Sequence, residues 1–468
     1  MAKKPHDLLI RGATVLSASD SFVADIAVSN GRVIALGEDL GPAQESIDAR
    51  GLVAAPGGVD AHTHLDMPCP GGTTADDFST GTAAALFGGT TTIIDFATQQ
   101  RGGSCLKALQ DWHAKADGKS FTDYAFHMAI TDMSESASRE MKRLIGEGVT
   151  SFKLYMAYPA LLSDDAAILR ALERSNEIGG LIALHCENEP AIDRLIKEAI
   201  AAGHIEPRFH PLTRPPQAEA EAVSRAVSLA ETAQAPVYIV HLSAADSLEE
   251  VRRARRRGVA VLAETCPQYL YLASHEYDKP FCEAARSVIS PPLRSKEHSQ
   301  ALWQALSWGE FQAVATDHCT FPMHSKPGKP GKDRGLKDFS KIPGGAPGLE
   351  TRMLLMWEAV QKGRISSSRF VDLTSTGPAK AFGLYPRKGH LMPGADADIV
   401  LIDPQHRTTI AAADLHHAVD YTPFEGICVH GAIREVFLRG RRAVSQGRLL
   451  AKKGQGRFLQ CSQRQFCL

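Results

Sequence analysis

Short apolar and β-branched runs recur through the middle of the chain, and most of them close on a polar residue. The eight runs are VDAHTH from Val59, TTIIDFAT from Thr91, YAFHMAI from Tyr124, SFKLYMA from Ser151, LIALHCEN from Leu181, VYIVHLSA from Val237, VAVLAETC from Val259 and QAVATDHC from Gln312. Helical patterns such as SDDAAILRALERSNEIGG separate most of them. Strands that alternate with helices indicate βα units and a parallel sheet, and eight units predict a closed (β/α)8 barrel of the TIM type.

The polar residues of these runs lie mostly towards the carboxyl ends of the expected strands. In a (β/α)8 barrel the active site lies at that end. We therefore expect side chains from separate strands to converge on one mouth. They are His62, His64, Asp95, Lys153, His185, His241, Glu264 and Asp317.

Both ends of the chain have a different pattern. Residues 7–55 and 386–445 read as short strands joined by Gly and Asn turns. We expect a small β-sandwich built from both chain ends, with domain bounds of 1–55, 56–385 for the barrel, and 386–468. The last residues, KKGQGRFLQCSQRQFCL, have no clear period and are interpreted as a tail that can reach a neighbouring subunit.

Composition narrows the function classes. The 468 residues are 44% hydrophobic and 22% charged, as in an ordinary globular protein, and the net charge of −1 provides no field for nucleic acid or an anionic membrane. No apolar run is long enough to span a bilayer, and the N-terminal segment has no apolar signal core. The nine cysteines form no CxxC pair or disulfide framework. We expect a cytoplasmic protein with reduced thiols.

The pair His62 and His64 is the first candidate metal site. Side chains two apart on a strand point the same way, so both imidazoles can bind one metal ion. A chance pair of histidines is the alternative. Asp60 lies on the same face, and we expect this carboxylate to orient the two imidazoles.

Two more histidines and an aspartate strengthen the metal interpretation. His185 follows LIAL and His241 follows VYIV. A single histidine after such a run is more often a core residue, but two on adjacent strands favour ligands. Asp317 follows AVAT, and a buried carboxylate must be paired or bind a metal.

Lys153 lies in the apolar stretch TSFKLYMAYPA. On an exposed strand it would simply reach solvent. Period two instead places Lys153 and Tyr155 inside the barrel and Phe152 outside. Burial and nearby cations lower a lysine pKa, and a neutral amine can react with carbon dioxide to form a carbamate. That anion has two oxygens and can bridge two metal ions, a pair that activates water and polarises a carbonyl.

With these residues in place, the chain resembles the dihydropyrimidinase and D-hydantoinase family of the amidohydrolase superfamily. The matching stretches are GGVDAHTHLD, ADDFSTGTAAALFGGTTTIIDFATQ, TSFKLYMAY, HCEN, YIVHLSAADSLEEV, AETCPQYLYL, SPPLR and TDHC. They occur in family order over nearly the whole chain.

The resemblance implies a cofactor and a residue set. Two zinc ions would be held, one by His62, His64 and Asp317 and the other by His185 and His241, with carboxylated Lys153 and a hydroxide bridging them. Asp317 would act as general base and then as general acid, and Tyr158 would donate to the developing oxyanion. Ser290 and the loop after KIP, at Gly344, would hold the substrate through backbone groups. Many family members have asparagine where this chain has Gly344.

The resemblance also implies an activity: hydrolysis of the ring amide of 5,6-dihydropyrimidines, 5-substituted hydantoins or both to N-carbamoyl amino acids, in a homotetramer or homodimer. One alternative is a dihydroorotase or allantoinase. Dihydroorotase-type sites carry an arginine shortly after the HxH pair, where this chain has Leu65, Asp66 and Met67. Another alternative is an inactive scaffold of the collapsin response mediator type, although all six ligand positions are filled here.

Overall fold

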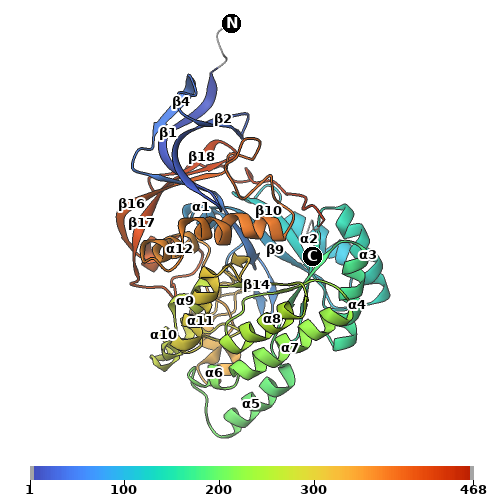
Figure 1. The fold of residues 1–468 in the computed structure, drawn as a ribbon. Coiled ribbons are helices and arrows are strands. Elements are labelled where there is room, and N and C mark those ends of the chain that lie inside the picture. The colour runs from blue at the N-terminus through green and yellow to red at the C-terminus, as the bar shows by residue number, and fades with distance from the viewer. Residues whose placement is uncertain (1–4, 464–468) are drawn as a thin grey trace.

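A parallel eight-stranded sheet forms the centre of the molecule (Figure 1) in the computed structural model, which describes residues 5–463. The strands are β6 (Gly58–Thr63), β9 (Thr90–Thr98), β10 (Asp123–Ala129), β11 (Ser151–Tyr155), β12 (Leu181–His185), β13 (Val237–Ile239), β14 (Val261–Thr265) and β15 (Ala313–Val314). Neighbours in sequence are neighbours in the sheet, and a parallel bridge between Thr63 and His318 brings the two edges together. All eight predicted strands are present, and the barrel prediction is confirmed.

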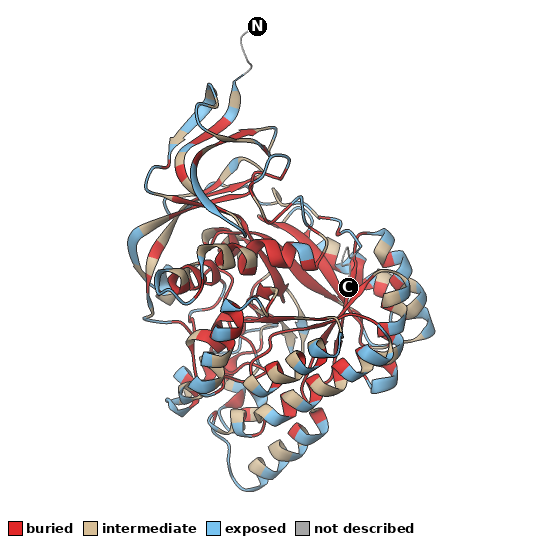
Figure 2. Ribbon diagram, in the orientation of Figure 1, coloured by how far each residue is buried: buried red, intermediate tan, exposed pale blue. Residues whose placement is uncertain are grey.

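Helices cover the outside of this barrel. They are α1 (Thr80–Phe87), α2 (Cys105–Ala116), α3 (Glu135–Gly146), α4 (Asp165–Glu177), α5 (Glu189–Ala201), α6 (Phe209–Leu212), α7 (Pro216–Thr232), α8 (Ala245–Arg256), α9 (Pro267–Tyr271), α10 (Phe281–Ala284), α11 (Lys296–Ser307), α12 (Arg352–Gln361), α13 (Ser367–Val371) and α14 (Gly377–Ala381). Short helical turns are η1 (Ser274–Asp278), η2 (Ala285–Ser287), η3 (Lys332–Gly335), η4 (Phe339–Lys341), η5 (Asp372–Thr376) and η6 (Ala412–Asp414). Figure 2 shows that the strands are buried and that the outer helix faces are exposed.

Alternation along β11 sets which side chains enter the barrel. Phe152 and Leu154 belong to the large apolar cluster between the strands and the helices. Lys153 and Tyr155 have the opposite orientation: the Lys153 Nζ lies 5.3 Å from the centre of the Tyr155 ring, and that ring contacts His185. The predicted orientation of Lys153 is therefore confirmed.

Both chain ends form a second, separate sheet. Its strands are β1 (His6–Leu16), β2 (Ser21–Ser29), β3 (Arg32–Gly37), β4 (Ala43–Asp48), β5 (Val53–Pro56), β16 (Ile399–Thr409), β17 (Cys428–Leu438), β18 (Arg441–Ser445) and β19 (Arg448–Leu449). The antiparallel pair β5–β16 joins the two halves, and hydrogen bonds connect all nine strands. The expected β domain built from both ends is confirmed. The domain bounds 1–55, 56–385 and 386–468 stay a prediction, and β5 runs across the first of them. A small hairpin, β7 (Pro68–Cys69) and β8 (Gly72–Thr73), follows β6.

The C-terminal segment lies against the barrel of its own chain. The backbone N–H of Tyr124, at the start of β10, donates to the carbonyl of Arg457 (3.0 Å), and Leu459 donates back to Tyr124 (2.7 Å). Farther along, Cys461 donates to Gly148 (2.9 Å). The described residues up to 463 therefore contact their own barrel, and the interpretation as a tail that can reach a neighbouring subunit stays a prediction. Up to residue 463, the segment meets β10 through one isolated bridge, between Tyr124 and Phe458, and forms no regular strand or helix. Residues 464–468 of that tail lie outside the described residues.

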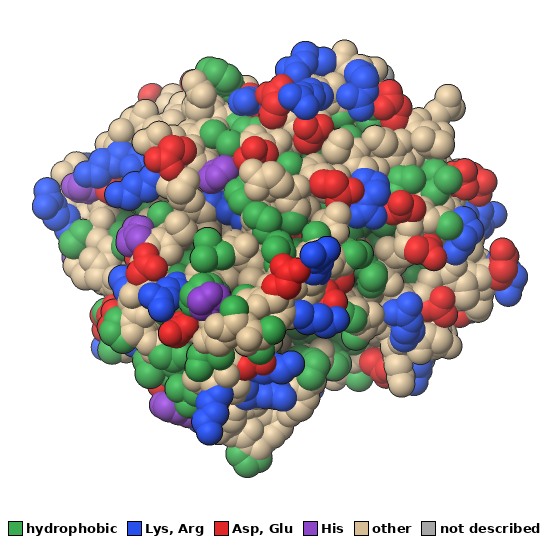
Figure 3. Space-filling model, turned by 90° about the horizontal axis from the view of Figure 1, so that it is seen from below, with side chains coloured by type: hydrophobic (Ala, Val, Ile, Leu, Met, Phe, Trp, Pro, Cys, Tyr) green, Lys and Arg blue, Asp and Glu red, His purple; other side chains and the backbone are tan. Residues whose placement is uncertain are grey.

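The surface agrees with the near-zero net charge. On the face drawn in Figure 3, acidic and basic side chains are interspersed and form no extended patch of one sign. Among residues 5–463, every helix is too short or too polar to cross a bilayer.

Candidate metal centre and active site

The carboxyl ends of the barrel strands gather the predicted polar residues. His62 lies in β6 and His64 just beyond it, Lys153 lies in β11, and His185 ends β12. His241 and Asp317 follow the short strands β13 and β15 by two and three residues. Parallel strands place these positions at one rim, which is why residues so distant in sequence meet.

His62, His64 and Asp317 form one group. The Oδ1 atom of Asp317 lies 3.3 Å from Nε2 of His62 and 3.1 Å from Nε2 of His64. The planes of the two imidazole rings are inclined at 69°, with their centres 5.1 Å apart. Three donor atoms from two strands therefore face one point.

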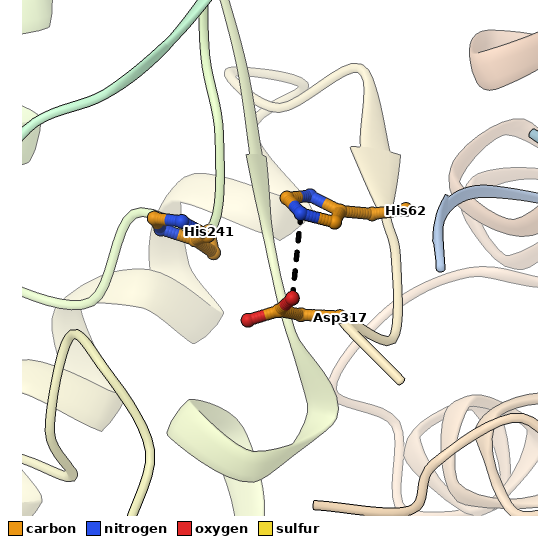
Figure 4. A group of neighbouring side chains, drawn as sticks. All are labelled: His62, His241 and Asp317. Carbon is orange, nitrogen blue, oxygen red and sulfur yellow. Dashed lines mark ion pairs between the residues drawn. The ribbon is translucent and has the colours of Figure 1, made fainter. Parts of the chain in front are cut away.

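His185 and His241 form a second group beside the first. Nδ1 of His185 lies 2.9 Å from Nε2 of His241. The ring of His241 also lies 5.4 Å from that of His62, which joins the two groups. Ligand atoms of His62, His241 and Asp317 lie within 4.8 Å of one another. Figure 4 shows these three side chains pointing toward a common space, with the contact between His62 and Asp317 drawn as a dashed line.

Burial keeps these imidazoles in the form that binds metal ions. It lowers the pKa of His62 and of His241 far below the usual histidine value, and it lowers the pKa of His185. A neutral imidazole has a free lone pair on one nitrogen. Burial alone would raise the pKa of Asp317, but the neighbouring His62 and His64 hold it below its usual value. Neutral histidines with a carboxylate suit zinc, so the donor set fits that metal.

Lys153 lies among the same groups. It is buried, and its Nζ is 5.4 Å from the centre of the Phe96 ring, which also stacks on His64. Burial lowers the pKa of Lys153 to about 8, opposed by the negative charges of Glu264 and Asp317. Near neutral pH a larger fraction of Lys153 is therefore a neutral, nucleophilic amine than in an ordinary lysine.

Two buried glutamates orient the histidines. Oε1 of Glu264 lies 2.5 Å from Nδ1 of His62, and its other oxygen accepts a hydrogen bond from the Tyr238 hydroxyl (2.9 Å). Oε2 of Glu187 lies 2.8 Å from Nε2 of His185. Such partners fix which nitrogen of a histidine faces the metal. The sequence placed Glu264 at a strand end without a role and gave no role to Glu187, whose only signal was its position two residues after His185.

Asp60 does not orient the imidazoles as expected. Its Oδ1 accepts hydrogen bonds from the backbone N–H of His62 (3.2 Å) and of Thr316 (3.1 Å). Its other oxygen lies 3.6 Å from Nε of Arg352. Asp60 therefore joins β6 to the segment after β15, and Glu264 has the position that the sequence interpretation gave to Asp60.

Three non-glycine residues of the site have left-handed backbone conformations. The φ angles are +35° at His241, +51° at Asp317 and +67° at Tyr158. Such angles cost roughly 1–3 kcal/mol each and persist where surrounding contacts enforce them. The backbone N–H of Tyr158, for example, donates to Oε2 of Glu189 (2.8 Å). Strain gathered at one rim is typical of a functional site.

The three expected substrate contacts lie at the same rim. The ring of Tyr158 is 4.9 Å from that of His185. Burial raises the pKa of the Tyr158 hydroxyl, opposed by Arg214 and by a hydrogen bond with the Ser290 side chain, so this hydroxyl keeps its proton. A Cβ built on Gly344 would be 3.6 Å from Oγ of Ser290, which places these two residues side by side.

A barrel whose mouth gathers several imidazoles and a carboxylate is typical of metal-dependent hydrolases. The chain matches the amidohydrolase family model over residues 53–443. It is 47% identical to the D-hydantoinase of Streptomyces coelicolor, with 96% of this chain and 97% of that protein covered. The chain belongs to the amidohydrolase family and, within it, to the dihydropyrimidinase and D-hydantoinase family.

Solved structures agree with this assignment. The dihydropyrimidinase from Brevibacillus agri is 44% identical, with a TM-score of 0.95 and 97% of this chain and 98% of that chain covered. The L-hydantoinase (dihydropyrimidinase) from Arthrobacter aurescens is 30% identical, with a TM-score of 0.87 and coverage of 97% and 99%. The protein is thus an enzyme of the hydantoinase and dihydropyrimidinase type, a class of hydrolase that acts on C–N bonds.

Proposed function

We propose that this protein is a dizinc cyclic amidohydrolase that opens the ring amide of 5,6-dihydropyrimidines and 5-substituted hydantoins, giving N-carbamoyl amino acids. The observation that carries the proposal is the two adjoining groups of donor atoms at the barrel mouth. Nitrogens of His62 and His64 face one oxygen of Asp317, and nitrogens of His185 and His241 face each other. The similarity to hydantoinases and a dihydropyrimidinase supports the substrate class.

His62, His64 and Asp317 would hold one zinc ion, and His185 and His241 the other. When bound, the two ions supply an activated water and polarise the amide carbonyl. Lys153 would help to hold the ions as a carbamate: its neutral amine attacks carbon dioxide, a C–N bond forms as one C=O π bond becomes a C–O⁻ bond, and the nitrogen loses one proton to solvent. The buried position of Lys153 and its lowered pKa favour the neutral amine that this reaction needs.

Asp317 would move the proton. Its Oδ1 faces the two imidazoles, which leaves Oδ2 to accept a proton from the attacking water. Asp317 then delivers that proton to the ring nitrogen as the C–N bond breaks, so one residue is base and then acid. The contacts of Oδ1 with His62 and His64 would hold this carboxylate in place.

Tyr158 would donate a hydrogen bond to the carbonyl oxygen as negative charge develops there, since its hydroxyl keeps its proton. Backbone groups of Ser290 and Gly344 would hold the ring. A neutral ring agrees with the residues after His64: none of Leu65, Asp66 and Met67 offers the guanidinium that a substrate carboxylate would need. A homotetramer or homodimer in the cytoplasm stays a prediction from the resemblance.

The test is a comparison of kcat/KM for dihydrouracil, for a 5-substituted hydantoin and for dihydroorotate, with zinc-loaded enzyme. We expect ring opening of both neutral rings and at least about 100-fold lower kcat/KM for dihydroorotate, because its carboxylate finds no cationic partner. Dihydroorotate as the preferred substrate would contradict the proposal, as would the absence of ring opening with all three compounds.

A further inference from the structure

Lys332 is a buried lysine at the centre of a cage of main-chain carbonyls. It begins η3, and its Nζ donates to the carbonyls of Val288 (2.9 Å), Pro343 (2.7 Å) and Gly345 (2.7 Å). The side chain is among the largest fully buried ones. In the described part of the chain no carboxylate forms an ion pair with Lys332; its Nζ is hydrogen-bonded to the three carbonyls and lies 6.0 Å from the centre of the Phe321 ring.

The number of carbonyls matches the chemistry of an ammonium group. Lysine in its charged form has three N–H donors and no acceptor, and each donor has one oxygen here. Burial lowers the pKa of Lys332 to about 7. A buried charge is costly unless it is fully hydrogen-bonded, and a neutral amine would leave one carbonyl without its donor. An apolar residue at this position would leave the carbonyls of Pro343 and Gly345 without this partner.

The cage joins two segments that also carry the proposed substrate contacts. Val288 lies two residues before Ser290, and Pro343 and Gly345 lie on either side of Gly344. The backbone N–H of Gly345 also donates to the carbonyl of Val288 (3.0 Å), so that carbonyl has two donors. Ser290 and Gly344 lie side by side just beyond the cage.

The backbone of Lys332 is also held by hydrogen bonds. Its backbone N–H donates to the carbonyl of Pro322 (2.9 Å), and the next residue, Asp333, donates to Met323 (3.0 Å). Pro322 and Met323 belong to the segment that leaves the barrel after Asp317. The backbone of Lys332 is therefore bonded to the segment after Asp317, and its Nζ is bonded to the segments of Val288 and of Pro343 and Gly345.

We propose that Lys332 is a positioning residue that sets the distance between the Ser290 and Gly344 segments and so fixes the main-chain contacts to the cyclic amide. This inference rests on the proposed function for the role of those two segments. Lys332 touches no reacting atom, and its effect acts through its three hydrogen bonds. Misplacement of a substrate by about 1 Å can lower a reaction rate by roughly 100-fold. The loss of the three Lys332 hydrogen bonds should therefore have a measurable effect on turnover.

A series graded by the number of N–H donors tests the proposal. Lys332→Gln keeps two donors and Lys332→Met keeps none at similar length. We expect kcat/KM for a 5-substituted hydantoin to fall about tenfold or more for Lys332→Met, mostly through KM, with Lys332→Gln between it and the wild type. Zinc content should stay unchanged. The matched control is Lys337→Met, an exposed lysine on the same segment, which should behave as wild type.

Hydrogen exchange of the same variants gives a readout independent of turnover. Residues 286–292 and 342–348 should exchange faster in Lys332→Met than in wild type, and α3 should be unchanged. If kcat/KM stays within twofold of wild type, if the loss follows a loss of zinc, or if the two segments exchange as in wild type, the proposal is wrong. If wild-type enzyme opens no cyclic amide, the proposed function fails, and the exchange measurement alone decides whether Lys332 ties the segments.

Discussion

Replacement of Glu264 should weaken zinc binding, although Glu264 is not one of the proposed ligands. One carboxylate oxygen is 2.5 Å from Nδ1 of His62 and the other accepts the Tyr238 hydroxyl, and all three side chains are buried. Removal of the carboxylate leaves the Tyr238 hydroxyl without its acceptor and frees the His62 ring to turn or change tautomer. Loss of such a partner typically costs 10–100-fold in metal affinity, or about 1.4–2.7 kcal/mol.

Two substitutions separate charge from geometry. In Glu264→Gln the amide oxygen can still accept from His62 while its NH2 group faces the Tyr238 hydroxyl, so we expect a loss of about tenfold. Glu264→Ala removes both contacts and should approach about 100-fold. Zinc dissociation constants from competition with a chromogenic chelator measure this. Tyr238→Phe is the control, because it leaves the contact with His62 in place. An alanine variant that binds zinc as tightly as wild type would refute the reasoning.

Three further predictions concern Lys153, Tyr158 and Asp76. Lys153→Ala should lose zinc and nearly all turnover, and normal zinc content with normal turnover would exclude the carbamate. Tyr158→Phe should lower kcat roughly 10²–10³-fold at unchanged zinc content, and equal turnover would remove this hydroxyl from the mechanism. The third prediction concerns pH and Asp76. Burial alone would raise the pKa of Asp76, but hydrogen bonds from His318, from the Thr80 side chain and from the backbone of Ala418 lower it from 3.8 to about 2. Its stabilisation of about 2 kcal/mol is present above pH 4 and is lost between about pH 4 and pH 2. In urea unfolding of metal-free protein, the gap between wild type and Asp76→Asn should narrow over that range; a constant gap would contradict it.

The sequence predicts the barrel and the position of the metal site because both depend on short-range periods. A strand with His62 or His185 at or near its end can be recognised from a few consecutive residues. Parallel strands then bring such ends together, so this prediction needs no knowledge of side-chain packing. The same period of two correctly directs Lys153 inward.

Contacts between distant segments could not be predicted in this way. Glu264 is 202 positions from His62, and nothing near either residue indicates their pairing. The nearer carboxylate, Asp60, was the natural choice from sequence, yet it binds backbone groups instead. The positive φ of His241 could not be predicted either, because histidine, although enriched among non-glycine residues with positive φ, has this conformation at only a small fraction of its positions. The carbonyl cage of Lys332 also forms only after three separate segments have folded together.

The central claim is that two zinc ions in one barrel mouth open a cyclic amide. Metal-free enzyme can be titrated with zinc in bicarbonate buffer while ring opening of a 5-substituted hydantoin is followed. The account predicts that activity rises until two equivalents of zinc per chain are bound and then stays constant. Full activity at one equivalent, or no activity at any zinc content, would contradict it.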